Sequence, residues 1–431
     1  MPELLRDPLE RALASAVAAM SLSRGMFFAV SALYFTRGVG LSPAVVGIGL
    51  TLAGGVGVLA SYVGGRLSDR WGADRLQQWA LAANGASLLA YSLAGDVVSF
   101  VLVAACVSAT RGLQSTAQMT MLARWYVGPE RVAVRARLRV VMNVLIGIGT
   151  LLAGLALMAD TTMAYRLTVV LVGAITILGT VPLIGLRRRV AGLAARMDAS
   201  GSAEASRGRS PLRDRTYVAS TVLNAVLAVH FGLTTVGVPL WVADHTDAPT
   251  IVVSALLLVN TAYVALFQVR ASRGTQNLRT AGRSVRRAGL LLLTACLLFA
   301  LAGHLGAAAA IAVLFLAALA SSAAETQGEA GGWGMAFELA DPTRAGAYQG
   351  LSQTGNALAL MLGPAVVTTT AIDHGTPGWI ALGTLFAATG TATAVVANHA
   401  ATHRDQRNTP VGPLPPELDA TVAPRGRGDQ N

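Results

Sequence analysis

Two glutamates in an otherwise apolar stretch are the residues of this sequence best suited to chemistry. Glu325 and Glu329 lie within LASSAAETQGEAGGWGMAFEL, and four residues apart on a helix they share one face. A carboxylate among apolar groups, with a second carboxylate beside it, is held near the balance between its charged and protonated forms. The pair predicts a proton-exchange site, with Glu325 favoured because it lies nearer the middle of its apolar run. The alternative is a static salt bridge that holds two parts of the molecule together.

Two arginines also stand inside apolar runs, at Arg24 and Arg111. An arginine near the middle of a bilayer costs at least about 2.5 kcal/mol by insertion scales, so each should face a cavity or a partner and not lipid. We expect Arg111 to polarise a nearby acid and to tie proton binding to movement. The alternative is a structural arginine that donates to helix carbonyls.

The elements that must position these groups are membrane-spanning helices. The chain of 431 residues is 53% hydrophobic and 13% charged, whereas a soluble domain carries about 25% charged residues. Apolar runs of about 20 residues cross a bilayer core of about 30 Å as helices, and in lipid they must be helical. Twelve spans are predicted, at residues 12–36, 43–65, 76–95, 98–125, 138–160, 165–186, 216–242, 249–269, 287–303, 307–336, 347–371 and 377–398.

The spans fall into two sets of six. This predicts an all-α integral membrane protein with two pseudo-symmetric six-helix bundles, residues 1–186 and 216–400, related by an axis along the membrane normal. Residues 187–215 are polar and rich in Gly, Ser and Arg, and are predicted to form a mobile cytoplasmic linker. Residues 401–431 are rich in Pro, Gly and charge, and are predicted to form a disordered cytoplasmic tail.

The placement of arginine predicts the orientation in the membrane. The net charge is +11. With the N-terminus in the cytoplasm, nearly all loop arginines fall on the cytoplasmic side, including those of the run from Arg131 to Arg139, and only Arg37 and Arg166 fall outside. We therefore predict a multi-pass protein of the cell membrane with both termini cytoplasmic. The basic charge is then a signal of topology and not of nucleic-acid binding.

The stretch GGRLSDRWGADR, residues 64–75, lies between the second and third predicted spans. It resembles the loop signature G-x-L-a-D-R-x-G-r-k of the major facilitator superfamily, and the matching residues are Gly65, Leu67, Asp69, Arg70 and Gly72. The resemblance covers about residues 10–400 and implies the twelve-helix fold of that family. It also implies that Gly65, Asp69, Arg70 and Gly72 form a gate between outward- and inward-facing states. The alternative is an ordinary hydrophilic loop.

Two further segments bear on a resemblance to the proton-coupled drug exporters of that family. In TRGLQSTAQMT, Arg111 with Gln114 resembles the element R-x-x-Q-G, although Ser115 replaces the glycine. In NVLIGIGTLLAGLAL, Gly147, Gly149 and Gly154 resemble the glycines of the antiporter signature, but the proline of that signature is missing. The missing proline leaves the direction of transport open.

The family fold implies that helices 1, 4, 7 and 10 line a central cavity. This would bring Glu325 and Glu329 near Arg111 or Arg24, so that the acid pairs with an arginine in one state and is protonated in the other. The remaining residues expected to line the substrate site are Gln114, Gln118, Asn224, His230, Gln327 and Trp333. His230 is equally consistent with a hydrogen-bonded packing histidine.

We therefore predict a secondary active transporter that works by alternating access, most simply a proton-coupled exporter of drug-like or natural-product compounds. One alternative is a proton-coupled importer of an anionic metabolite that Arg24 and Arg111 attract. Another is a non-transporting membrane sensor or scaffold.

The sequence contains no phosphate-binding loop and no catalytic triad, so no enzyme activity is expected. Cys106 and Cys296 lie in apolar runs and indicate neither a disulfide framework nor a metal site. The expected partners are a small-molecule substrate, protons and the lipid bilayer, with no cofactor and no nucleic acid, for a protein that acts as a monomer.

Overall fold

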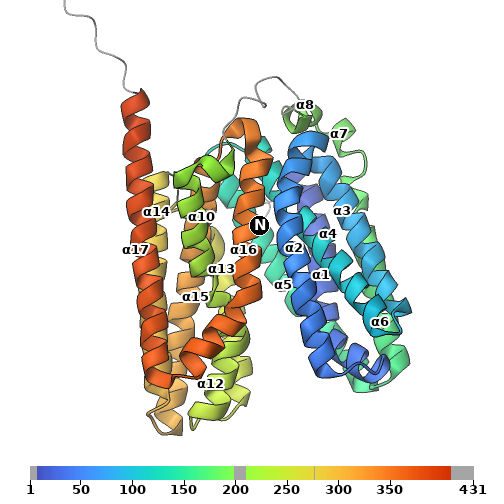
Figure 1. Ribbon diagram of the computed structural model, residues 1–431, viewed down its shortest axis with the longest axis vertical. Coiled ribbons are helices and arrows are strands. Elements are labelled where there is room, and N and C mark those ends of the chain that lie inside the picture. Colours follow the sequence, from blue (N-terminus) through green and yellow to red (C-terminus); the bar gives the residue numbers. More distant parts are fainter. Residues whose placement is uncertain (1–6, 199–209, 276, 409–431) are drawn as a thin grey trace, which may run out of the picture.

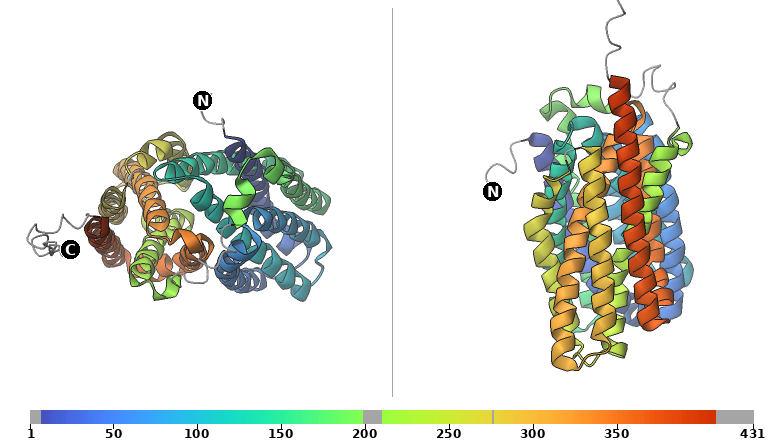
Figure 2. Two further views of the ribbon diagram at one scale, coloured as in Figure 1. Left: turned by 90° about the horizontal axis from the view of Figure 1, so that it is seen from above. Right: turned by 90° about the vertical axis from the view of Figure 1, so that its left-hand side faces the viewer.

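The computed structural model describes residues 7–198, 210–275 and 277–408. All regular secondary structure in these ranges is helical, and the helices form two bundles that lie side by side (Figure 1). The view from above in Figure 2 shows the same two groups, with the N-terminal and C-terminal halves of the chain in separate bundles. The predicted fold class, with twelve spans in two six-helix bundles, is confirmed.

The first bundle contains six long helices, which are α1 (Pro8–Leu33), α2 (Pro43–Trp71), α3 (Ala73–Ala90), α4 (Val97–Trp125), α5 (Glu130–Ala159) and α6 (Thr162–Leu178). The second bundle begins with a span in four pieces, which are α10 (Arg215–Ala228), α11 (His230–Gly232), η6 (Leu233–Gly237) and α12 (Val238–His245). Its other helices are α13 (Ile251–Ser272), α14 (Leu278–Ala302), α15 (Ala307–Glu338), α16 (Ala345–Val367) and α17 (Gly375–Asn408).

Short polar side chains fix where several of these helices begin. The Asp7 carboxylate accepts a hydrogen bond from the Leu9 amide at the start of α1. Asp96 and Ser99 form a capping box at the start of α4, and Asn277 and Thr280 form another at the start of α14. Each such cap satisfies amide groups that the first helical turn leaves unbonded.

Helix α14 begins at Leu278, nine residues before the start predicted from hydropathy. The extra turns are amphipathic. Ala281 and Val285 are buried, while the arginines of this segment are exposed, namely Arg279, Arg283, Arg286 and Arg287. A hydropathy window reads such a segment as polar because it averages the two faces, whereas the buried face continues the helix beyond the apolar run.

Ten helical spans of the described chain are long and apolar enough to cross a membrane, and α1 and α3 are not among them. Both are more polar: α1 carries Glu10, Arg11 and Arg24, and α3 carries the buried side chains of Asp74 and Asn84. Helix α1 packs against α5 and α6, and α3 packs against α4 and α6. Neighbouring helices therefore cover Glu10 of α1 and these two side chains of α3, whereas Arg11 and Arg24 of α1 are exposed.

The segment between the bundles is partly helical. It contains α7 (Leu186–Arg189) and α8 (Leu193–Asp198), whereas residues 199–209 lie outside the described residues. Helix α17 continues to Asn408, and the rest of the predicted tail, 409–431, also lies outside them. We call the end of the molecule that carries α7 and α8 the linker end; it is at the top of Figure 1.

The two bundles share a hydrophobic core only toward the linker end. One apolar cluster, around Phe299 and Trp379, contains described residues of the second bundle alone. A second cluster, around Phe35, contains described residues of the first bundle alone. The third joins Leu122 and its neighbours in the first bundle to Trp333 and others in the second. Helices α2 and α16 lie side by side near the linker end and diverge toward the other end (Figure 1).

Glycine permits this close contact between α2 and α16. A Cβ atom added at Gly65 would lie 3.0 Å from the Cα of Gly350 and 3.1 Å from the Cα of Ala347, and would also meet the carbonyl oxygen of Gly346. These atoms belong to the backbone of α16 and cannot rotate away. The linker end can therefore close only if residue 65 has no side chain.

We predict that Gly65→Ala opens the linker end. Overpacking of this kind costs about 1–3 kcal/mol, which corresponds to about a 5- to 150-fold shift in the population of the closed arrangement. The measurement is the distance distribution between spin labels at the exposed residues Val127 and Thr343, in a background without Cys106 and Cys296.

The matched control is Gly55→Ala on the same helix, where an added Cβ would meet nothing within 4 Å. This variant should keep the short distance of the parent protein. A Gly65→Ala protein whose distances equal those of the control would contradict the assignment of Gly65 to the closing contact.

Candidate functional site

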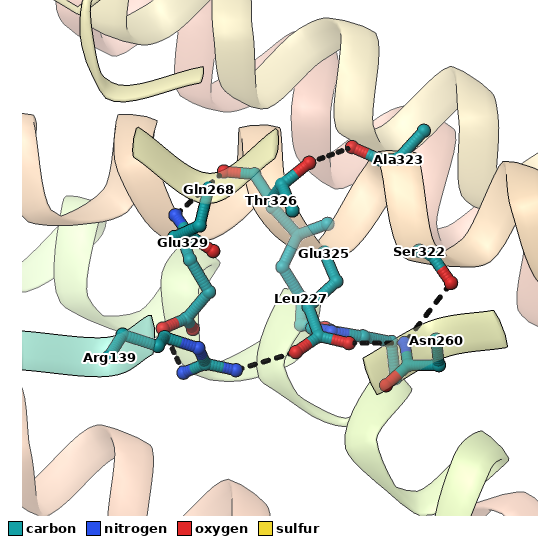
Figure 3. A network of polar contacts seen from close by, with 10 residues as sticks. Arg139, Leu227, Asn260, Gln268, Ser322, Ala323, Glu325, Thr326 and Glu329 are labelled. Atoms are coloured by element: carbon teal, nitrogen blue, oxygen red, sulfur yellow. Dashed lines mark hydrogen bonds and ion pairs between the residues drawn. The ribbon is translucent and has the colours of Figure 1, made fainter. Parts of the chain in front are cut away.

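A single guanidinium joins the two glutamates of α15 to the first bundle (Figure 3). Arg139 of α5 donates from Nη2 to Glu325 Oε1 at 2.6 Å and from Nη1 to Glu329 Oε2 at 2.8 Å. The side chains of all three residues are 13% exposed or less. Charges this well removed from water interact strongly, and each depends on the others for compensation. The two bundles are thus tied together by an ion-paired triad.

The arginine in this triad differs from the predicted one. The sequence analysis expected Arg111 or Arg24 to pair with the acid and counted Arg139 with the cytoplasmic charge. In the structure Arg139 is the tenth residue of α5 and is buried, and within the described chain neither Arg24 nor Arg111 forms an ion pair with a glutamate. One feature of the sequence could have indicated this role: Arg139 lies one residue inside the predicted span 138–160, and so within the membrane.

The second oxygen of Glu325 is also bonded. Asn260 of α13 donates from Nδ2 to Glu325 Oε2 at 2.9 Å and lies 3.2 Å from Ser322 Oγ (Figure 3). A cavity of about 20 Å³ lies beside these groups, and its polar lining includes Asn260, Ser321, Ser322 and Thr234. A space of this size holds about one water molecule where polar partners are present.

A break in the seventh span brings His230 and Phe231 to the triad. His230 Nδ1 lies 2.7 Å from the Leu227 carbonyl oxygen, which can only accept, so Nδ1 carries a proton and donates it. His230 Nε2 is buried and has no hydrogen-bond partner. The imidazole is close enough to Glu325 for a positive charge on it to act on that carboxylate. His230, predicted to line the substrate site, thus lies beside the triad.

Aromatic rings cover the arginines of α5. The Arg139 guanidinium lies 5.4 Å from the Phe231 ring centre and 6.0 Å from that of Trp333, and Arg135 lies 5.1 Å from the Trp333 ring centre. Cations are attracted to aromatic faces at these distances. Trp333, predicted to line the site, thus supports the arginines and belongs to the core shared by the bundles.

The two arginines predicted for the site form a positively charged row with Arg139. Arg24 lies close enough to Arg139 for the two charges to repel, and Arg111 lies correspondingly close to Arg24. The side chain of Arg24 is exposed and that of Arg111 is half-buried. In the described part of the chain neither forms an ion pair. The structure therefore gathers the predicted arginines near the triad but leaves their charges uncompensated.

The other predicted lining residues are spread more widely. Gln114 and Gln118 of α4 are buried, and Gln118 Nε2 has no hydrogen-bond partner. Asn224 lies against Gly332 of α15, on the side that faces α10. Gln327 is two residues from Glu325, which places it about 200° further round the helix, and Ser284 of α14 donates to its carbonyl oxygen. Gln327 thus lies on a different face of α15 from the triad.

Asp69, which the loop signature predicts to be part of a gate, makes a second link between the bundles, at the linker end. It lies at the end of α2, and its carboxylate accepts hydrogen bonds from the Gly346 and Ala347 amides of α16, both at 2.8 Å. The residue that precedes α16, Arg344, provides no side-chain cap of its own. Asp69 therefore caps a helix of the opposite bundle, where its negative charge also suits the positive end of the helix dipole.

The arginine that accompanies Asp69 is Arg124 and not Arg70. Arg124 of α4 donates from Nη2 to Asp69 Oδ1 at 2.7 Å, and its Nη1 also donates to the Met197 carbonyl of α8. Arg70 is exposed and forms no ion pair with any residue that the structure describes. The ion pair of Asp69 is therefore made by an arginine two helices away in sequence.

Gly72 gives the turn between α2 and α3, with a φ of +90° that favours glycine. A Cβ there would lie 2.6 Å from Arg187 Nη2 and 2.9 Å from Asp198 Oδ1. Arg187 bridges Asp74 and Asp198, which fastens α7 and α8 to the turn. The hydrogen bonds from Arg187 lower the pKa of the Asp198 carboxyl. The start of the linker is therefore attached to the first bundle.

The three glycines of α5 that resemble the antiporter signature do not all allow close packing of a neighbouring helix. Gly149 packs against the backbone of Leu22 in α1, whereas added Cβ atoms at Gly147 and Gly154 would meet nothing within 4 Å. In the part of the chain that the structure describes, no group of three or more histidine, cysteine or acidic side chains is arranged to hold a metal ion.

Two six-helix bundles joined by a polar linker, with ion pairs buried between them, define a membrane protein of the transporter class. The sequence matches the family model described as Major Facilitator Superfamily over residues 13–364, so the chain belongs to the major facilitator superfamily. A comparison with curated protein sequences finds no match. Family and fold indicate a multi-pass membrane transporter and not an enzyme.

Solved structures of transporters share this fold at low sequence identity. A bacterial homologue of the iron transporter ferroportin in an outward-facing state has a TM-score of 0.68 at 14% identity, covering 91% of this chain and 99% of its own. The proton:xylose symporter XylE gives 0.66 at 14% identity, with 90% and 94% covered. The human organic anion transporter MFSD10 (TETRAN) gives 0.65 at 15% identity, with 90% and 100% covered.

We predict that Asp69→Asn loosens the linker end. The substitution keeps one acceptor but removes the charge that faces Arg124 and the helix dipole, and hydrogen bonds to charged groups contribute about 1.5–3 kcal/mol. A cysteine placed at the buried residue Ala345 should therefore react about 10- to 100-fold faster with a small maleimide.

Asp96→Asn is the matched control, because Asp96 also caps a helix but does so within one bundle and at the opposite end. It should leave the reactivity of the cysteine at residue 345 unchanged. Equal rates in the two variants would show that Asp69 does not hold the bundles together.

Proposed function

We propose that this transporter is coupled to protons and that the triad of Arg139, Glu325 and Glu329 is its coupling site. The observation that carries the proposal is the ion pair between Arg139 of the first bundle and Glu325 of the second. Breaking a buried ion pair by neutralising one partner costs about 3–5 kcal/mol, because the other charge is left uncompensated. A proton on Glu325 therefore shifts the balance between closed and separated bundles, which alternating access requires.

The orientation follows from the placement of arginine. The linker end carries the basic residues of α7, the turn after α2 and the start of α14. Positive charge is concentrated on the cytoplasmic side of membrane proteins, so we place the linker end and both termini in the cytoplasm. With that orientation, Asp69 and the shared core close the cytoplasmic side, and the arrangement described here is an outward-facing one.

The small cavity beside Asn260, which has both polar and apolar lining residues, offers a place for a water molecule on the way to Glu325. One water there would contact Asn260 and the hydroxyl groups of Ser321 and Ser322, which line it. It would lie on the side of Glu325 away from Arg139, because Asn260 bonds Oε2 and Arg139 bonds Oε1. A proton can thus reach Oε2, the oxygen that accepts from Asn260, without first displacing the arginine.

The direction of transport has two candidates. Efflux of drug-like compounds is what the resemblance of Arg111 and Gln114 to the drug-exporter element implies, and uptake of an anion is what the charges of Arg24 and Arg111 favour. The structurally similar proteins include a proton:sugar symporter and an organic anion transporter, which is consistent with proton coupling and with several substrate classes. A sensor or scaffold without transport would show no flux at all.

We predict that Glu325→Gln reduces substrate-dependent proton flux by about 100-fold or more, since an amide cannot take up and release the proton. Glu329→Gln should reduce it by about tenfold, the lower end of the loss expected when one charge-assisted hydrogen bond to Arg139 is weakened. The assay uses proteoliposomes with a pH-sensitive dye in the lumen and a panel of compounds added outside.

The control is Glu338→Gln, on the same helix but away from the triad, where the carboxylate pairs with Arg404 at the linker end. It should transport as the parent protein does. Undiminished proton movement in Glu325→Gln would refute Glu325 as the coupling residue.

A further inference from the structure

We propose that the substrate is a small organic anion held by Arg24 and Arg111, and that this anion and the proton cross the membrane in the same direction. The inference rests on the proposed proton coupling at Glu325. It adds the chemical class of the substrate and the sign of the coupling, which together favour uptake over efflux.

The first support is the balance of charge between the bundles. Four arginines of the first bundle form a chain in which each lies within electrostatic range of the next, in the order Arg111, Arg24, Arg139 and Arg135. The described carboxylates that compensate them are Glu325 and Glu329, so the cluster carries an excess of two positive charges. Each unpaired arginine at membrane depth is costly, and mutual repulsion adds to that cost. An anion at this position would relieve both.

The second support is the availability of hydrogen-bond donors. The guanidinium groups of Arg24 and Arg111 have no ion-pair partner in the residues described, and the Arg24 side chain is exposed. Gln118 is seven residues after Arg111, so it lies on the same face of α4, and its Nε2 is buried without a partner. Between them Ser115 bonds Gln353 of α16, so this face of α4 looks toward the opposite bundle. Arginine is well suited to the planar, bidentate recognition of such an anion.

The third support is the effect of a proton on this site. Groups facing Glu325 are Arg139 from α5, His230 from α11, Asn260 from α13 and Glu329 from α15 itself. Protonation of Glu325 removes one negative charge and releases a guanidinium arm of Arg139, so the excess rises to three positive charges. An anion therefore binds more tightly to the protonated protein.

Thermodynamic linkage makes this effect reciprocal: a bound anion favours the protonated carboxyl to the same extent. The fully loaded protein then carries both, and the pair crosses together when the bundles exchange their contacts. A cationic substrate would instead compete with the proton for the same carboxylates, and the two would be exchanged. The sign of the linkage thus separates symport from antiport.

The test measures binding to the purified full-length chain with probes whose charge does not change with pH. The anions are methanesulfonate, benzenesulfonate and naphthalene-1,5-disulfonate, which differ in size, and the matched cation is benzyltrimethylammonium. We expect at least one sulfonate to bind, and to bind more tightly at mildly acid than at neutral pH. Arg24→Gln and Arg111→Gln should each weaken that binding about 10- to 100-fold, the loss expected for a charge-assisted hydrogen bond.

Two further variants keep the test decisive. Glu325→Gln imitates the protonated carboxyl, so it should bind the sulfonate tightly at both pH values; this gain cannot arise from misfolding. Arg166→Gln, at the opposite end of the first bundle, should bind as the parent does. Failure of all three sulfonates, preference for the cation, or weaker sulfonate binding at acid pH would each overturn the proposal. Arginine-dependent binding with a pH response that Glu325→Gln leaves unchanged would instead retain the anion site and reject Glu325 as the coupling group.

Discussion

The ion pair between Arg139 and Glu325 is the interaction on which the rest of this structure depends. It is buried, it joins one bundle to the other, and with the neighbouring pair of Arg139 and Glu329 it places carboxylates that a proton can neutralise in the contact between the bundles. Buried ion pairs add little net stability compared with apolar packing, but losing one partner is costly. Such a pair therefore adds little to stability but suits a conformational switch. A single proton changes its free energy by an amount comparable to the free-energy difference between two conformations.

The remaining contacts between the bundles do not have this property. The Asp69 cap on α16, the backbone contact at Gly65 and the apolar cluster around Trp333 all act at or near the linker end. They hold that end closed, and all three contacts must break when the two bundles separate there. The triad lies deeper, and under the proposed function protonation would act on the linker end through α15, which carries both Glu325 and Trp333.

Much of the architecture could be predicted from the sequence, because it is encoded locally. Length and hydropathy predicted the twelve spans, and the loop signature located Asp69 as a linker-end contact. The partners of these residues could not be predicted in the same way. Arg139 and Arg124 pair with Glu325 and Asp69 from helices distant in sequence, and which side chains meet across two bundles depends on helix rotation that a single sequence does not reveal. The early start of α14 and the break at His230 were missed for a related reason: burial and tertiary contacts override the hydropathy signal at both positions.

The most direct test of this account is the infrared difference spectrum of the Glu325 carboxyl group, obtained by subtracting the spectrum of Glu325→Gln. A disulfide between cysteines introduced at Ser115 and Gln353, whose side chains are hydrogen-bonded, would hold the bundles in the closed arrangement. The account predicts that mild acidification produces no protonated-carboxyl band from Glu325 while this disulfide is intact, because Arg139 retains the charge, and that the band appears once the disulfide is reduced. A band of equal size before and after reduction would show that protonation of Glu325 is independent of the separation of the bundles, and would contradict the central claim.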